Sequence, residues 1–475
     1  MRARATTFIA VLLPVATSLG GLGCQQVPPR PLAPERTAAA FAARSLAAPE
    51  LATFLAAARG APVEWPLRTW DLRTLTLAAL YFQPQLEVVR AHADVAAAAI
   101  ETAGARPNPT LSLAPQLSAN PAGAISPWLA AVHFDWPIET AGKRARRLER
   151  ADAAAAAARA AVVVEAWRVR RQVASALVAL TAATRQRRGL VAEAAVDTRL
   201  VALLQRRLDV GEAAANDVAP LRLALLQTTI ERAAADVQVD DALGRLAAAV
   251  GVPGAALGAV TLPEGLDAAD AEALLRVSAD DARRRALLER ADVRQALAEY
   301  AAAEATLRLE LARQYPDLRL GPTYEFDQGQ NKWGLSLALD LPLLDRNQGP
   351  IAEAVAARAE AAAKLTATQA GVIAEVEQAV ARRDGELARR AQVRALAAAR
   401  DANAARAARG VALGAVDRVT ELAAALEGLR AERAVAEAES ALEQALVDLE
   451  SAMEGPLPAV AVERPLQSAA IGGAT

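Results

Sequence analysis

The chain has 475 residues, of which 53% are hydrophobic but only 3% aromatic, and its formal net charge is −2. Without an excess of basic residues it lacks the electrostatic footprint of a nucleic-acid-binding protein. Long stretches of Ala, Leu, Glu and Arg are typical of packed long helices, so we expect about two-thirds helix rather than the roughly one-third of an ordinary globular protein.

The N-terminal residues 1–23 predict an export signal. Arg2 and Arg4 give it a charged start, and the apolar run that follows is too short to span a membrane. Cys24 is the only cysteine and therefore has no partner for an internal disulfide. Its position resembles a bacterial lipobox, in which this cysteine is acylated, although Gly21 replaces the usual leucine. The alternative is an ordinary cleaved signal followed by an incidental cysteine.

Residues 24–70 begin with a predicted lipidated tether. The stretch 25–48 is rich in Pro, Ala and Arg, which is typical of an extended linker. No later segment reaches the ~20 uninterrupted apolar residues of a membrane-spanning helix. Strands would therefore have to make any membrane crossing.

From residue 71 the chain repeats one order of elements. Residues 71–254 and 285–455 each predict a helix, two strands, a very long Ala-rich helix and a return helix. Three landmarks recur at separations of 209, 205 and 203 residues, namely Pro107 with Pro316, Asp135 with Asp340, and Gly211 with Gly414. We predict one body of two similar halves, joined by a linker at 255–284 and followed by a flexible tail at 456–475.

Four short runs alternate between apolar and polar residues, which predicts strands at about 109–118, 128–137, 317–327 and 332–342. Each run has about ten residues, as a tilted strand that crosses a bilayer has. Near the run ends lie aromatic residues suited to a membrane interface, namely Trp128, Trp136, Tyr324, Phe326 and Trp333. A soluble, half-buried hairpin has the same alternation. The export signal and the lack of a second amphipathic sheet favour the membrane.

Four strands cannot close a membrane barrel, because open edges are not tolerated in lipid and such barrels have at least about eight strands. The chain is therefore predicted to oligomerise through its sheet edges. Three copies would supply twelve strands around one shared pore.

The two longest helices are predicted at about 143–210 and 350–409. At ~1.5 Å per residue the first would be roughly 100 Å long. The chain is expected to reverse at the two turn glycines, into return helices at about 213–251 and 415–453. Helices this long cannot form a small globule, so a tall helical cylinder below the strands is predicted.

In their order, the motifs resemble those of the TolC family of outer-membrane efflux ducts, in particular its CzcC-like members. The segments that carry the resemblance are Leu75–Leu80, Gln83–Leu86, Arg106–Pro109, Pro137–Arg144, Gly211–Ala213 and Tyr315–Asp317. The resemblance implies a mainly helical, lipid-anchored homotrimer with a shared twelve-stranded transmembrane β-barrel and a long α-helical periplasmic barrel. An equatorial region would include the end of the tether and the linker between the repeats.

The resemblance also implies a function in the bacterial outer membrane, surrounded by its lipid. The trimer would be a passive efflux duct for substrates that an inner-membrane pump of the resistance-nodulation-division (RND) class and a periplasmic adaptor deliver. Metals, drugs, solvents and dyes all remain open as substrates. Two alternatives stay open: an outer component of type I protein secretion, and a lipid-anchored periplasmic coiled-coil scaffold without a pore.

In this family the hairpin turns at the periplasmic tip close the tunnel and meet the adaptor. The resemblance implies these roles for Arg207, Gly211, Asp217, Gly414, Asp417 and Arg418. Asp217 lies six residues after Gly211, as a tip acid of the family does, whereas Asp417 lies only three after Gly414. Carboxylate rings in a trimer would concentrate negative potential at the constriction. Simple helix capping is the alternative.

The remaining polar motifs indicate no catalysis. The basic run Lys143–Arg150 starts a helix. Its side chains either face lipid phosphates or are simply solvated. His133 and Asp135 lie on the polar side of a strand, but two histidines in the whole chain make no metal-ligand set. Neither a phosphate-binding glycine loop nor a nucleophile motif occurs. We therefore predict no enzyme activity, cofactor or metal.

Overall fold

The structure, a computed structural model, describes residues 27–119, 123, 125–258, 260–455 and 457. It divides into two units, residues 1–44 and 45–475. In the first unit, helix α2 (Pro34–Ala42) begins with a proline, whose fixed φ suits a first helical turn. The predicted export signal and Cys24 lie outside the described residues, as does the predicted tail except for residue 457.

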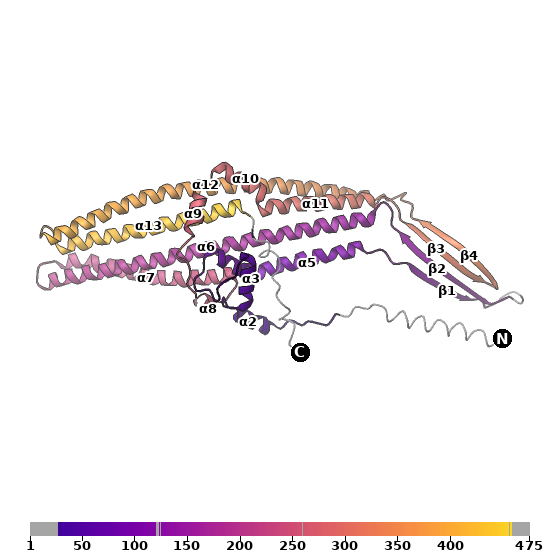
Figure 1. Ribbon diagram of the computed structural model, residues 1–475, viewed down its shortest axis with the longest axis horizontal. Coiled ribbons are helices and arrows are strands. Elements are labelled where there is room, and N and C mark those ends of the chain that lie inside the picture. The colour runs from indigo at the N-terminus through magenta and orange to yellow at the C-terminus, as the bar shows by residue number, and fades with distance from the viewer. Residues whose placement is uncertain (1–26, 120–122, 124, 259, 456, 458–475) are drawn as a thin grey trace. The chain divides into compact units, whose positions relative to one another are not determined.

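The second unit contains both repeats (Figure 1). After α3 (Pro49–Arg59), the first repeat has α4 (Leu72–Phe82), α5 (Pro84–Gly104), β1 (Thr110–Leu117), β2 (Trp128–Ile138), α6 (Lys143–Asp209) and α7 (Ala215–Val250). The linker has α8 (Gly254–Leu257), α9 (Ala268–Leu275) and α10 (Ala279–Glu289). The second repeat has α11 (Ala291–Ala312), β3 (Leu318–Asp327), β4 (Gln330–Leu339), α12 (Gln348–Ala412) and α13 (Arg418–Met453). The prediction of a mainly helical, two-repeat chain with four strands is confirmed.

The long helices α6 and α12 end in the same kind of turn. Gly211 and Gly414 adopt φ values of 79° and 70°, a left-handed conformation that glycine takes at little cost. The N–H of the residue after each glycine donates to the carbonyl five residues earlier, at 2.8 Å in both turns. This bond satisfies a carbonyl that the ending helix would otherwise leave unpaired.

Helices α6 and α12 are the two long supports beside which the shorter helices pack. In the half that ends at the turns, the packing order is α7–α6–α13–α12, and in the half next to the sheet it is α5–α6–α11–α12 (Figure 1). The strands continue this order as β1–β2–β3–β4. From the turns to the sheet, one edge of the second unit is therefore formed by α7, α5 and β1 of the first repeat. The other edge is formed by α12 and β4 of the second repeat.

The antiparallel register of the sheet brings all four apolar runs to one face. Leu113 pairs with Val132, Val132 with Tyr324, and Tyr324 with Trp333. Directly paired residues project from the same face of a sheet. The rows above and below follow the same alternation, so the opposite face collects the polar residues.

Each repeat has its own buried core. Helices α4 to α7 surround a large cluster in which Leu75, Leu86 and Leu177 are fully buried. Helices α10 to α13 enclose a smaller one around Val376 and Leu449. Among the described residues, none of the helices combines the length and the apolar character that crossing a membrane requires.

Candidate functional site

All five predicted interface aromatics lie on the apolar face of the sheet. Trp128 and Trp136 are 53% and 56% exposed and Trp333 is 80% exposed, whereas Tyr324 and Phe326 are half-buried. The rings of Tyr324 and Trp333 pack with their centroids 4.7 Å apart. An exposed apolar face of this extent needs lipid or protein to cover it.

The opposite face of the sheet is polar and charged. Arg319 Nη1 lies 3.6 Å from a carboxylate oxygen of Asp135, and Lys332 Nζ lies 2.6 Å from one of Asp327. His133 projects from this face as well, because it pairs with Thr323. Within the described ranges, His, Cys, Asp and Glu form no group of three or more that could hold a metal ion. The two faces differ in polarity as they would with lipid on one side and water on the other.

The predicted tip acids cap different positions of the return helices. Asp217 Oδ2 accepts a hydrogen bond from the Ala214 N–H at 2.9 Å. Asp417 directly precedes α13 and accepts from the Thr420 N–H at 2.8 Å and the Thr420 hydroxyl at 2.7 Å. Counted from the turn glycines, Asp417 is the counterpart of Ala214 and not of Asp217. The two tips are therefore not symmetric.

Arg207 joins the two hairpins. Its Nη1 donates to Asp417 Oδ2 at 2.9 Å, so this ion pair links the end of α6 to the start of α13. Hydrogen bonds from Thr420, and then from Arg207, lower the pKa of Asp417 to about 2, which keeps the carboxylate charged near neutral pH. Arg418 instead pairs within its own helix, with Glu421 at 2.5 Å.

The sequence analysis did not single out two apolar residues beside the hairpin turns. Val210 and Leu413 directly precede the turn glycines and are 71% and 83% exposed. The available signal was an apolar residue in the same place in both repeats, next to a turn. Each tip therefore carries an apolar side chain that no other part of its own copy covers.

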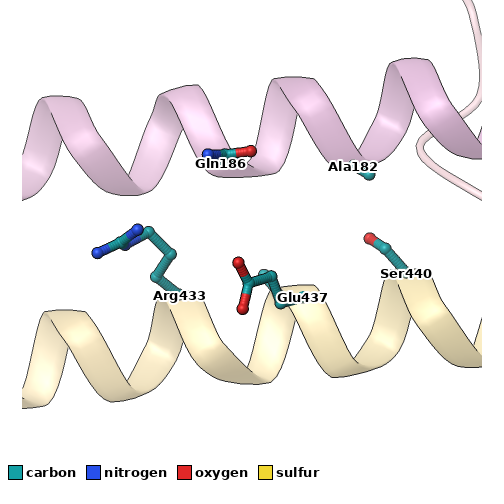
Figure 2. A pocket seen from close by; sticks show the side chains of 6 residues that line it. Ala182, Gln186, Arg433, Glu437 and Ser440 are labelled. Carbon is teal, nitrogen blue, oxygen red and sulfur yellow. The ribbon is translucent and has the colours of Figure 1, made fainter. Parts of the chain in front are cut away.

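Above the Arg207–Asp417 pair, apolar and ionic contacts alternate between α6 and α13. A small apolar cluster comes first, formed by Val196, Leu200, Leu422 and Leu426. Next to it Glu193, only 3% exposed, accepts from Arg433 Nε at 2.7 Å. Arg433 and Glu437 of α13 and Gln186 of α6 line a cavity of about 170 Å³. Figure 2 shows these side chains in the space between the two helices. The side chains that line this cavity make fewer dispersion contacts than they would in a filled seam.

Several cations of the basic run at the start of α6 bind other parts of the chain. Lys143 Nζ forms an ion pair of 2.7 Å with Asp317. Arg144 and Arg147 donate to carbonyls in the last turn of α5, at 2.7 and 3.2 Å. These cations satisfy carbonyls at a helix C-terminus and complement its dipole. Neither interpretation of the run, as a lipid-facing or a solvated segment, anticipated these contacts.

The return helix of the first repeat ends in a neutral junction. Gln83 Nε2 donates to the carbonyls of Ala248 and Ala249 at 3.3 and 3.0 Å. Gly251 follows with a φ of 83°. A Cβ at this glycine would lie 2.9 Å from the Phe82 carbonyl oxygen, so the close approach requires glycine.

The corresponding junction of the second repeat is charged. Arg290 stands where the first repeat has Gln83, and its Nη1 donates to the Ala452 carbonyl at 3.3 Å. Glu454 stands where the first repeat has Gly251, and it accepts from the Ala291 N–H at 2.7 Å. These two residues form, with Asp292 and Glu375, the charged junction of the second repeat.

The charged junction holds a carboxyl group that titrates near neutrality. Burial raises the pKa of Glu454 to about 7, against the opposing effects of the Ala291 N–H and Arg290. Arg290 is 7% exposed and forms 2.6 Å ion pairs with both Asp292 and Glu375, so these two acids compete with Glu454 for its positive charge. Protonation of Glu454 removes one of the competing negative charges.

Comparisons with known proteins agree with this architecture. The family model described as "Outer membrane efflux protein" matches residues 77–252 and 282–455, one segment in each repeat. No curated protein sequence matches the chain.

Several solved structures share the fold. The outer membrane protein VceC of Vibrio cholerae has a TM-score of 0.66 at 22% identity, over 81% of this chain and 96% of that one. The CmeC outer membrane channel of Campylobacter jejuni has a TM-score of 0.63 at 14% identity, over 91% and 94%. The MtrE outer membrane channel of Neisseria gonorrhoeae, solved in an open state, has 0.59 at 17% identity, over 84% and 91%.

Proposed function

We propose, because the chain belongs to the outer membrane efflux protein family, that it is the passive outer-membrane duct of a tripartite efflux system. Three copies would complete one pore. An RND-type inner-membrane pump would deliver the substrate, with a periplasmic adaptor between pump and duct. Acylation of Cys24 would add a lipid anchor to the strands that cross the membrane.

The sheet is the observation that carries this proposal. Its apolar face suits lipid and its polar face suits a water-filled lumen. Strands β1 and β4 are the two edges of the sheet, and lipid cannot satisfy the backbone groups of an open edge. Because four strands alternate in direction, β4 of one copy can pair antiparallel with β1 of the next. A closed ring of copies then leaves no edge.

Single-channel recording tests the proposed function. The full-length protein, reconstituted in a planar lipid bilayer, is expected to give discrete conductance steps and to migrate as a trimer in detergent. A scaffold without a pore would give no steps, and that result would reject the proposal. A type I secretion component would also conduct, so export of a protein substrate instead of small molecules in a complemented strain would favour that alternative.

We further propose that the hairpin tips hold the periplasmic end of the duct closed. The Arg207–Asp417 pair supports this, because it ties the two hairpins of one copy together at their tips. The partly hollow seam above it supports it too, since fewer packed contacts oppose separation of the hairpins. MtrE, which has the same fold, is known in an open state. Val210 and Leu413 would offer the adaptor apolar contacts.

Arg207→Gln and Asp417→Asn are each expected to favour the open state. Asparagine can still cap α13, so the second variant removes only the charge. The proposed trimer has three such exposed ion pairs, one in each copy, and each is worth about 0.2–1 kcal/mol. Losing all three would shift the open–closed equilibrium towards the open state by about 3- to 150-fold. The open probability in single-channel records measures this shift. Arg418→Gln is the matched control, since Arg418 pairs within its own helix, and an equal effect of all three variants would contradict the gate.

A further inference from the structure

The outer face of α7 carries an exposed apolar stripe. Towards the turn, α7 packs on α6 through buried residues that include Val218, Thr228 and Ala235. On the opposite side, Leu223, Leu226, Ile230 and Val237 are 68%, 59%, 64% and 68% exposed. With Ala219 and Ala233 they follow the alternating spacing of four and three residues that characterises a coiled-coil seam. These six residues are the α7 stripe.

The outer face of α12 has the same spacing but small side chains. Ala379, Arg383 and Ala397 are the buried residues of this part of α12, which packs on α13. The opposite side exposes Gly385, Ala388, Gln392, Ala395, Ala399 and Ala402, and these six residues are the α12 strip. Side chains this small allow another helix to approach closely.

The stripe and the strip match in size when both are counted from their turns. Ile230 lies 19 residues after Gly211, and Ala395 lies 19 residues before Gly414. By the same count Leu223 faces Ala402, Leu226 faces Ala399 and Val237 faces Ala388. The one small residue between them, Ala233, falls opposite Gln392, the one long residue of the strip. At each of these five positions a large side chain thus stands opposite a smaller one.

Charge is complementary beyond the stripe as well. Glu212 and Asp217 lie one and six residues after Gly211, and both are exposed. Arg406 and Arg409 lie eight and five residues before Gly414 and are also exposed. Counted from the turns, the acidic start of α7 and the basic end of α12 therefore lie at similar distances along their helices, so their opposite charges would face each other.

We propose that the α7 stripe of one copy packs into the α12 strip of the next copy. The inference rests on the proposed ring of copies, in which β4 of one copy meets β1 of another. Because α7 and β1 lie on one edge of the chain and α12 and β4 on the other, the ring that closes the sheet also brings stripe and strip together. The large residues come from α7 only and the small ones from α12 only. The seam therefore favours contact between the α7 edge of one copy and the α12 edge of the next over contact between two identical edges.

Disulfide crosslinking of the full-length chain tests this seam. Ile230→Cys with Ala395→Cys is expected to form intermolecular disulfides under mild oxidation, up to a covalent trimer. Ile230→Cys with Ala381→Cys is the matched control, because Ala381 lies about 21 Å further along α12 and disulfides need Cβ atoms about 4 Å apart. Equal crosslinking of both pairs, or of neither in a trimer, would overturn the inference.

Exchanging the large and the small residue provides a second test. Ala395→Ile alone is expected to overpack the seam and lower the melting temperature of the trimer. The double variant Ile230→Ala and Ala395→Ile is expected to regain most of that loss. A trimer that conducts but shows neither crosslink nor rescue would reject the seam and leave the duct intact, whereas a monomer without conductance would reject the duct itself.

Discussion

Gly321→Ala is expected to prevent assembly of the four-stranded sheet and, with it, membrane insertion. A Cβ at this position would lie 1.6 Å from the carbonyl oxygen of Phe134 and 2.7 Å from its carbonyl carbon. Both are backbone atoms, so no rotamer change can relieve the overlap. Strands β2 and β3 would have to separate, although their pairing is what joins the strands of the two repeats.

The amount of trimer in the outer-membrane fraction measures this effect. Even adjustable cores lose about 1–3 kcal/mol on overpacking, so we expect a loss of about ten-fold or more. Gly334→Ala is the matched control, because its Cβ would meet only the Thr323 hydroxyl, at 2.8 Å, and that side chain can rotate. Normal insertion of Gly321→Ala would show that the β2 and β3 backbones do not approach each other this closely.

Raising the pH towards neutrality is expected to loosen the charged junction. Burial raises the pKa of Glu454 from 4.5 to about 7, so the fold stabilises the protonated carboxyl. The contribution of the protonated Glu454 carboxyl to the stability of the fold is complete below pH 4.5 and is lost as the pH rises through about 7. A shift of this size would correspond to about 3 kcal/mol, which solvent screening at the half-buried group reduces to about 1–2 kcal/mol.

Amide hydrogen exchange around Ala291, whose N–H bonds to Glu454, measures this loosening. Glu454→Gln keeps an acceptor for that N–H but does not titrate. Compared with this variant at each pH, the wild-type protein is expected to lose about ten-fold protection between pH 5 and 8, as about 1.4 kcal/mol requires. The neutral junction at Gln83 and Gly251 serves as the internal control. Identical pH profiles of the two proteins around Ala291 would contradict the prediction.

The sequence alone determined the types of the elements and their order. Apolar periodicity is a local property, so period two identified the strands, and long Ala-rich stretches with few helix breakers identified α6 and α12. Gly211 and Gly414 marked the reversals, because a left-handed residue at a helix end favours glycine. The recurrence of these landmarks carried the resemblance to the TolC family, which the family match and the shared fold confirm.

Only the tertiary structure decided which distant residues meet. Arg207 and Asp417 are 210 residues apart, and no local pattern pairs them. The capping of α5 by Arg144 and Arg147, and the exposure of the α7 stripe opposite α6, depend in the same way on how helices pack. Periodicity shows which face of an element is apolar, but what covers that face follows from contacts between segments far apart in the chain.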